Sequence, residues 1–137
     1  MNLVSIRIIT ADVQRLVHFY EQATGLQAIQ YTDDFAELQG GAATLAIGST
    51  RTLQFFGGTE VAQAAQNRSV IIEFLVPDVD SSYLRISGLI GPGLVQEPTL
   101  MPWGNKSLLF RDPDGNLVNF FTPVDPAAIR KFEAKIR

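Results

Sequence analysis

The stretch "FRDPDGNLVNFF" runs from Phe110 to Phe121 and places an Asp-Pro-Asp-Gly turn between two apolar runs. Turn residues of this kind between apolar segments predict a β-hairpin. The second arm, "LVNFF", contains one neutral amide, Asn119, among apolar residues. Because strand side chains alternate between two faces, Asn119 and Phe121 are expected to share one face, with Phe120 on the other. The amide therefore marks a strand position where a polar side chain replaces the apolar one that its neighbours would predict.

The composition indicates one globular domain. The chain has 137 residues, of which 46% are hydrophobic and 18% charged. No apolar run reaches the roughly 18 residues that a membrane span needs, and the N-terminus does not resemble a signal peptide. A net charge of −3 with scattered Lys and Arg argues against a nucleic-acid surface. The absence of Cys excludes disulfides and thiolate metal sites and is compatible with a cytoplasmic location. The single histidine, His18, is expected on a helix surface and cannot form a two-His site within one chain.

An internal repeat divides the chain into two halves. The segments "VSIRIITADV" (4–13) and "VIIEFLVPDV" (70–79) each predict a strand that ends at an Asp. Asp12 and Asp78 are expected to be the N-caps of the helices that follow, with Gly25 and Gly88 ending those helices. The first half adds one further strand, "AIQYTDDFAELQG", and the second half adds the less regular "LVQEPTLMPWG".

Each half is also expected to close with a hairpin. "TLAIGSTRTLQFFGG" (44–58) resembles "SLLFRDPDGNLVNFFTP" (107–123), which aligns Gln54 with Asn119. Alternation then places Phe56 and Phe121 beside the two amides, and Phe55 and Phe120 beneath the helices.

These patterns predict an α+β fold of two β-α-β-β-β modules, whose curved mixed sheets form a cup-shaped pocket. Module one covers about 1–58, a polar linker 59–69, and module two about 70–123, within a single domain of residues 1–137. A C-terminal helix over about 125–137 is predicted from Asp125 as N-cap and Pro126 at the first position. Its apolar stripe consists of Ile129, Phe132 and Ile136.

The paired modules resemble the vicinal oxygen chelate superfamily, which includes glyoxalases, bleomycin-resistance proteins and dioxygenases. The resemblance rests on "FRDPDGNLVNFF", on "PWG" (102–104) and on the strand-Asp-helix opening with "FYEQATGL", and it covers about residues 3–123. "YTDDFAEL" and "MPWGNKSLLFRDPDGN" look most like the bleomycin-resistance type. That likeness implies a small metal-free homodimer that binds a drug between two chains without changing it.

The metalloenzyme branch of that superfamily holds a divalent cation through His and carboxylate ligands. The resemblance places the four ligand positions on Ser5, Gln54, Ile71 and Asn119. Divalent cations prefer anionic oxygen or imidazole nitrogen, and this set supplies neither. We therefore expect no metal and no cofactor.

Several side chains are candidates for ligand contact. Trp103 in "PWG" and Phe35 could form aromatic walls, with Asp33 and Asp34 attracting a cation; core or turn roles are the alternatives. Arg7 and Glu73 occupy matching repeat positions on the cup face, where they could pair with each other or bind ligand. The predicted ligand-binding set is Trp103, Phe35, Asp34, Gln54, Phe56, Asn119, Phe121, Arg7 and Glu73.

The favoured function is metal-independent binding of an aromatic or cationic small molecule by a cytoplasmic homodimer. The alternative is a lyase or isomerase of the same fold. In that case Glu73 would be the acid or base, with its pKa raised by burial, and Glu37 and Glu97 are alternatives by composition only. A regulatory or structural module with an empty cup is a third possibility.

Overall fold

The computed structural model describes residues 1–135, so the predicted stripe residue Ile136 lies outside the described residues. Contacts within the chain group into two compact units, Met1–Asn67 and Arg68–Arg137. The first unit contains β1 (Ser5–Thr10), α1 (Val13–Thr24), β2 (Ala28–Thr32), β3 (Phe35–Gly40), β4 (Ala43–Ser49) and the 3-10 helix η1 (Thr50–Phe55). The second contains β5 (Ile71–Leu75), α2 (Val79–Ile90), η2 (Gly91–Gly93), β6 (Leu94–Leu100), β7 (Asn105–Arg111), β8 (Leu117–Pro123), α3 (Pro126–Phe132) and η3 (Glu133–Lys135).

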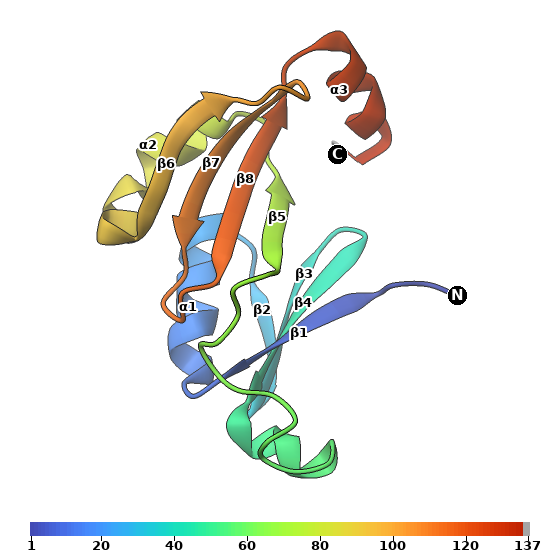
Figure 1. Ribbon diagram of the computed structural model, residues 1–137, viewed down its shortest axis with the longest axis vertical. Coiled ribbons are helices and arrows are strands. Elements are labelled where there is room, and N and C mark those ends of the chain that lie inside the picture. Colours follow the sequence, from blue (N-terminus) through green and yellow to red (C-terminus); the bar gives the residue numbers. More distant parts are fainter. Residues whose placement is uncertain (136–137) are drawn as a thin grey trace. The chain divides into compact units, whose positions relative to one another are not determined.

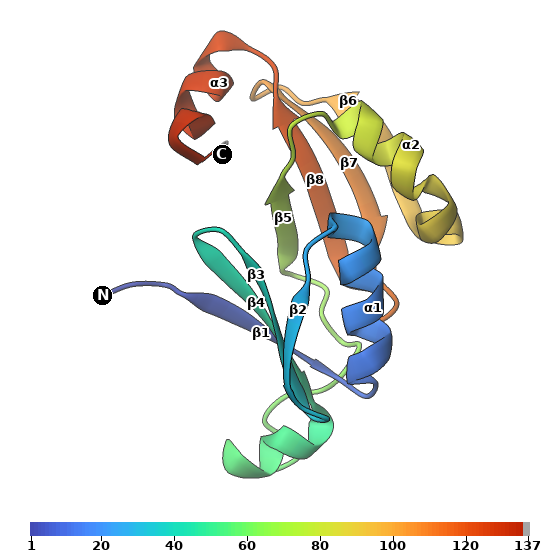
Figure 2. The same cartoon turned by 180° about the vertical axis from the view of Figure 1, so that it is seen from behind.

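Each unit has a curved four-stranded mixed sheet with the same topology (Figure 1). The strand orders are β1-β4-β3-β2 and β5-β8-β7-β6, so the opening strand of each unit pairs in parallel with the last strand. Helix α1 packs on β3 and β4, and α2 packs on β6, β7 and β8. Figure 2 shows α2 lying along one face of the second sheet. The predicted α+β fold with a C-terminal helix is confirmed.

The three predicted N-caps are present. Asp12 accepts a hydrogen bond from Arg15 N at 3.1 Å, and Asp78 accepts one from Asp80 N at 3.1 Å. Asp125 accepts one from Ala128 N at 2.8 Å and starts α3 at Pro126. Gly25 ends α1 in the left-handed conformation, as expected. The predicted stop at Gly88 is wrong, because α2 continues to Ile90 and Gly91 follows it.

The core of the second unit is an aromatic cluster beneath α2. The Phe120 ring lies 5.5 Å from that of Phe74 and 5.0 Å from that of Phe110, both in edge-on contact. Such pairs stabilise a core beyond their buried area. The prediction that Phe120 packs under a helix is confirmed. In the first unit α1 contributes Leu16 and Tyr20, which are fully buried with Ile47 of β4.

The predicted hairpin over 44–58 is wrong. The closing hairpin of the first unit is β3–β4, and "AIQYTDDFAELQG" forms two strands, β2 and β3, instead of one. The chain leaves the sheet at Ser49, whose side chain accepts a hydrogen bond from Arg51 N and starts η1. The Thr52 hydroxyl also donates to Ser49 O at 2.7 Å. These local bonds compete with strand extension.

This correction changes the repeat alignment. Strand β4, which pairs in parallel with β1, is the counterpart of β8, which pairs in parallel with β5. Arg7 lies opposite Ala46, and Glu73 lies opposite Asn119. The counterpart of Asn119 is therefore Ala46, and Gln54 lies on η1 outside the sheet. Phe55 is exposed, with 80% of its surface accessible, so its predicted place beneath a helix is also wrong.

The start of η1 provides a test by pH. Asp34 Oδ1 accepts from Arg51 Nε at 2.7 Å and from Ser49 Oγ at 2.8 Å. The Arg51 hydrogen bond, followed by that of Ser49, holds the pKa of Asp34 below its usual value. A lowered folded-state pKa means that this contribution to stability is present above the unfolded-state pKa and is lost as the pH falls through the folded-state pKa. We expect Arg51→Ala to raise the pKa of Asp34 toward the ordinary value of about 3.9, measured by NMR titration of the side-chain carboxyl. Arg15→Ala, on the exposed side of α1, should leave it unchanged; an unchanged Asp34 pKa in Arg51→Ala would contradict the assignment.

Gly104 joins the β6–β7 turn to α3 and provides a second test. Its carbonyl accepts from Val124 N and Asp125 N, and its φ is +93°. A Cβ at this position would lie 2.3 Å from the Asp125 carboxyl group. Gly104→Ala should therefore lower the free energy of unfolding by about 2 kcal/mol or more, through backbone strain and steric overlap together. Gly115→Ala is the matched control, because its φ is also positive, at +84°, but no atom lies within 4 Å of an added Cβ. Equal losses in chemical denaturation would rule out a role for the Asp125 contact.

Candidate functional site

The face of the first sheet opposite α1, here called the first open face, carries Arg7 among aromatic rings. The Arg7 guanidinium lies 4.5 Å from the ring centroid of Phe35 and 5.0 Å from that of Phe56. It crosses β4 over Gly48, where an added Cβ would lie 3.6 Å from an Arg7 nitrogen. Contacts of this kind between a cation and ring faces hold the guanidinium in place while it remains accessible. Three residues of the predicted set are thus brought together.

Tyr31 extends this aromatic surface. Its ring stacks on Phe35 at 5.8 Å between centroids, with 28° between the ring planes. A hydrogen bond to the Glu37 carboxylate, followed by desolvation, raises the pKa of Tyr31 above its usual value. Glu37 lies opposite Ala46, which in turn lies opposite Arg7. The first open face therefore presents stacked rings together with a cation and a carboxylate.

The corresponding face of the second sheet, here called the second open face, carries a carboxylate beside an amide. Asn119 Nδ2 donates a hydrogen bond to Glu73 Oε2 at 2.8 Å. Asn119 is buried and Glu73 is exposed, so the burial on which the predicted general-base role depended is not found. The structure places the two predicted residues together as a hydrogen-bonded pair.

Helix α3 covers part of this second open face. Phe121 follows Asn119 at strand spacing on the same face, and its ring lies 5.1 Å from that of Phe132 on α3. Phe121 is buried, with only 7% of its surface accessible. On the neighbouring strand, Ser107 lies opposite Phe121. Buried polar atoms without a hydrogen-bond partner within the described residues include Asn119 Oδ1, Ser107 Oγ and Asn105 Oδ1.

The residues at the family's metal positions do not suit a divalent cation. The corrected alignment gives Ser5 and Ala46 in the first unit, and Ile71 and Asn119 in the second. Ala46 and Ile71 have no donor atom, and Ser5 and Asn119 are neutral, whereas such ions prefer carboxylate or imidazole ligands. Elsewhere in residues 1–135, no cluster of three or more His, Cys, Asp or Glu side chains is arranged to hold a metal.

Other predicted residues lie apart from these two faces. The carboxylate of Asp34 is engaged by Ser49 and Arg51, and Gln54 lies on η1. Trp103 sits in the turn between β6 and β7, with 66% of its surface accessible. Asn105 lies opposite Pro123, which is four strand positions, or about 13 Å, from Asn119. Trp103 lies in the turn before Asn105. His18 is exposed on α1, as predicted.

Sequence reasoning missed Tyr31 and Ser107 as members of these surfaces. Tyr31 precedes the β2–β3 turn, and its stacking on Phe35 depends on the hairpin that was interpreted as one strand. A signal for Ser107 was available. Leu109 lies opposite Asn119, and Ser107 is two residues before Leu109, so alternation places Ser107 on the face of Asn119.

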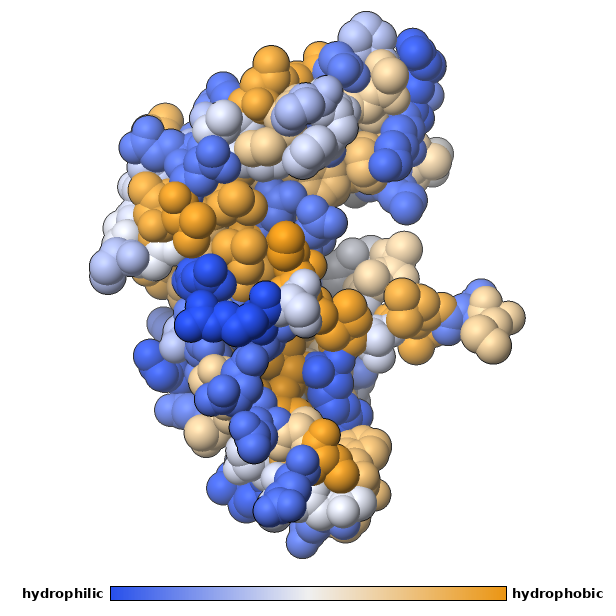
Figure 3. Space-filling model, in the orientation of Figure 1, coloured by the Kyte–Doolittle hydropathy of each residue, from blue (hydrophilic) through white to orange (hydrophobic). Residues whose placement is uncertain are grey.

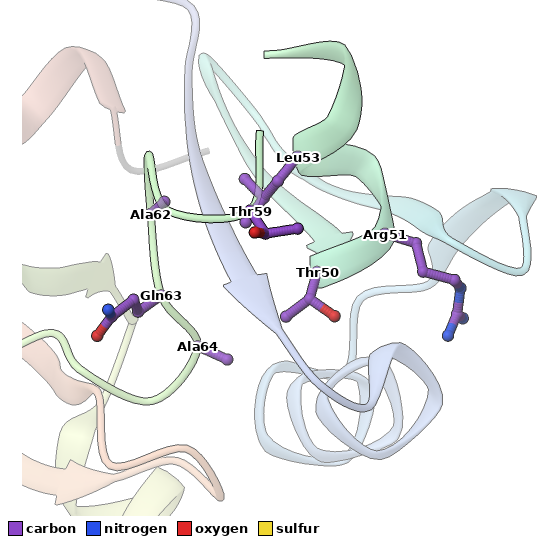
Figure 4. Close-up of a pocket in the computed structure, with 7 residues that line it drawn as sticks. All are labelled: Thr50, Arg51, Leu53, Thr59, Ala62, Gln63 and Ala64. Atoms are coloured by element: carbon purple, nitrogen blue, oxygen red, sulfur yellow. The ribbon is translucent and has the colours of Figure 1, made fainter. Parts of the chain in front are cut away.

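A separate cavity of about 350 Å³ lies between η1 and the loop that follows it (Figure 4). Its lining is mostly apolar and contains no residue of the predicted ligand-binding set: Thr50, Arg51, Leu53, Thr59, Ala62, Gln63 and Ala64. Its one charged side chain, Arg51, is paired with Asp34. With its charged side chain already paired, this cavity offers no free charge to orient a ligand.

None of the helices within residues 1–135 combines the length and apolar character needed to cross a bilayer.

Comparison with known proteins agrees with the observed fold. A family model described as the Glyoxalase/Bleomycin resistance protein/Dioxygenase superfamily matches residues 2–120. The uncharacterized protein YraH of Bacillus subtilis (strain 168) is 27% identical over 128 residues, covering 88% of this chain and 98% of that protein. A glyoxalase/bleomycin resistance protein/dioxygenase family enzyme from Burkholderia phytofirmans PsJN superimposes with a TM-score of 0.79 at 17% identity, covering 90% of this chain and all of that one (100%). A glyoxalase/bleomycin resistance protein/dioxygenase from Nocardioides superimposes with a TM-score of 0.74 at 20% identity, covering 92% of this chain and 85% of that one. These two structures support the fold alone, while the family model covers most of the sequence. The chain belongs to the glyoxalase/bleomycin resistance protein/dioxygenase superfamily.

Proposed function

We propose that this protein is a metal-independent, small-molecule-binding member of the superfamily that resembles the bleomycin-resistance type. It would act in the cytoplasm as a homodimer and sequester an aromatic or cationic ligand without changing it. The observation that carries the proposal is that residues without ligand atoms replace metal ligands on the paired strands of the two open faces. Ala46 and Ile71 stand at positions where a metal would need ligands, while rings and charged groups line the same faces.

The first open face supports the aromatic part of this proposal. Phe35 and Tyr31 stack on each other, and Arg7 lies over Phe35 and Phe56. A planar ligand would gain ring contacts here, because aromatic pairs add stabilisation beyond the area that they bury. The partial exposure of these side chains leaves them accessible to such a ligand.

Exposed apolar residues on edge strands support the homodimer. Leu3, Val4 and Ile6 are 87%, 64% and 47% accessible at and before β1, which is an edge strand of its sheet. Apolar atoms are visible along this N-terminal segment in Figure 3. Ile71 on β5, the edge of the other sheet, is 48% accessible. Unpaired apolar edges favour association with another chain.

The enzymatic alternative rests on one observation, the hydrogen bond that orients the Glu73 carboxylate. The exposure of Glu73 counts against this alternative, because enzymes usually raise the pKa of a carboxylate general base by burying it. Recovery of the bound ligand with unchanged mass would exclude a lyase reaction. An isomerase reaction leaves the mass unchanged, so it is excluded only by separating isomers by chromatography.

We expect protein treated with EDTA to bind a bleomycin-class compound, measured by calorimetry, with the fluorescence of Trp103, the sole tryptophan, as a second signal. Phe56→Ala should weaken binding about 10-fold, or about 1.4 kcal/mol, through loss of a ring at the first open face. Phe55→Ala is the matched control, because the adjacent ring is 80% exposed. A fluorescence and calorimetric titration without binding, or binding that returns only with added metal, would contradict the proposal.

The dimer is tested by placing a charge on an edge strand. Ile6→Arg should convert a particle of twice the chain mass into monomer, measured by light scattering after size exclusion, because an unpaired buried charge opposes association. Leu84→Arg on α2, where the native residue is 80% exposed, should leave the dimer intact. A wild-type chain that is monomeric at all concentrations would refute the homodimer.

A further inference from the structure

The Glu73–Asn119 pair leaves one polar atom unsatisfied. An ionised carboxylate only accepts hydrogen bonds, so the nitrogen end of the Asn119 amide must face Glu73, as the 2.8 Å contact shows. The oxygen of the amide, Asn119 Oδ1, therefore faces away from Glu73. It is buried without a hydrogen-bond partner in the described chain. An unsatisfied buried acceptor costs about 1–3 kcal/mol. Native proteins rarely retain such an atom without a role for it.

Ser107 repeats this situation on the neighbouring strand. Asn119 lies opposite Leu109, so Ser107 is its diagonal neighbour on the second open face, at about 7–8 Å between Cα atoms. Its hydroxyl is also buried without a partner in residues 1–135, and only 2% of Ser107 is accessible. Two polar atoms without a partner in the described residues therefore belong to neighbouring side chains on the same face.

The free atoms define the chemistry of that group. Asn119 Oδ1 and the Glu73 carboxylate are both acceptors, and the Ser107 hydroxyl can accept or donate. The basic side chains on β7 are engaged elsewhere: Arg111 donates to Gly115 O at 3.0 Å, and Lys106 pairs with Asp80 at 2.8 Å. The site therefore calls for several N–H donors on a positively charged group.

We propose that Glu73, Asn119 and Ser107 bind the cationic nitrogen group of the ligand, an amidinium, guanidinium or primary ammonium. This inference rests on the proposed function and adds which part of the ligand the second unit recognises. Glu73 is exposed whereas Asn119 is buried, so the carboxylate would meet the cation first. Charge-assisted hydrogen bonds of this kind are about twice as strong as neutral ones.

The test uses the full chain with benzamidinium, neutral benzamide and benzoate as probes, followed by NMR. Benzamidinium should bind at least about 10-fold more tightly than benzamide, and it should shift the side-chain amide signals of Asn119. Benzoate should bind most weakly. Equal affinity for benzamide, or no shift at Asn119 with about 10 mM benzamidinium, would overturn the assignment and leave a buried water as the partner of these atoms.

Variants separate recognition from folding. Glu73→Gln should reduce the preference for benzamidinium over benzamide toward unity, whereas Glu97→Gln, at an exposed carboxylate on β6 that accepts from Tyr83, should preserve it. Ser107→Ala should weaken benzamidinium binding about 5-fold without lowering the melting temperature, since the lost hydroxyl has no partner in the described part of the free protein. A Glu73→Gln protein with unchanged preference would refute the inference.

The two proposals fail independently. Binding of a bleomycin-class compound together with a preference for benzamide would overturn only the cation assignment. Binding of benzamidinium at Asn119 together with no binding of the larger aromatic compound would overturn only the proposed sequestering function.

Discussion

The parallel pairing between the first and last strands of each unit governs the rest of the structure. In the first unit β1 pairs with β4, and in the second β5 pairs with β8. A parallel pair needs a crossover, and the remaining strands with α1 or α2 form it, which places the helix on one face and leaves the other open. The register of this pair then decides which side chains stand next to each other on the open face.

Two units of the same topology carry different chemistry because of this register. Arg7 faces Ala46, and the small side chains of Ala46 and Gly48 leave space for the guanidinium to cross the strand to Phe35. Glu73 faces Asn119, whose amide nitrogen donates to the carboxylate, and the amide oxygen has no partner among residues 1–135. One open face therefore offers rings and a cation, and the other offers acceptors.

The strongest local signals were sufficient for most of the fold. Asp12, Asp78 and Asp125 cap helices as their spacing predicts, and the Asp-Pro-Asp-Gly turn forms the β7–β8 hairpin with Asn119 and Phe120 on opposite faces. The failure lay at "STRTLQFF", where a run of β-favouring residues follows Ser49 and Thr50. Hydrogen bonds of Ser49 and Thr52 close a 3-10 turn there, and they outweigh a strand preference of tenths of a kcal/mol per residue. That single error moved the counterpart of Asn119 from Ala46 to Gln54.

The sequence alone determined the repeat, the helix starts, the fold class and the identity of the unusual amide, because caps, turns and alternation act over a few residues. The resemblance drawn from it also implied that the family's metal positions in the second unit fall on Ile71 and Asn119, neither of which is charged. The tertiary structure alone decided that Arg7 meets Phe56, which follows η1, that Asn119 bonds to Glu73 and that Phe132 of α3 covers Phe121. These contacts join residues far apart in the chain, so they depend on strand register and packing, which no local pattern specifies.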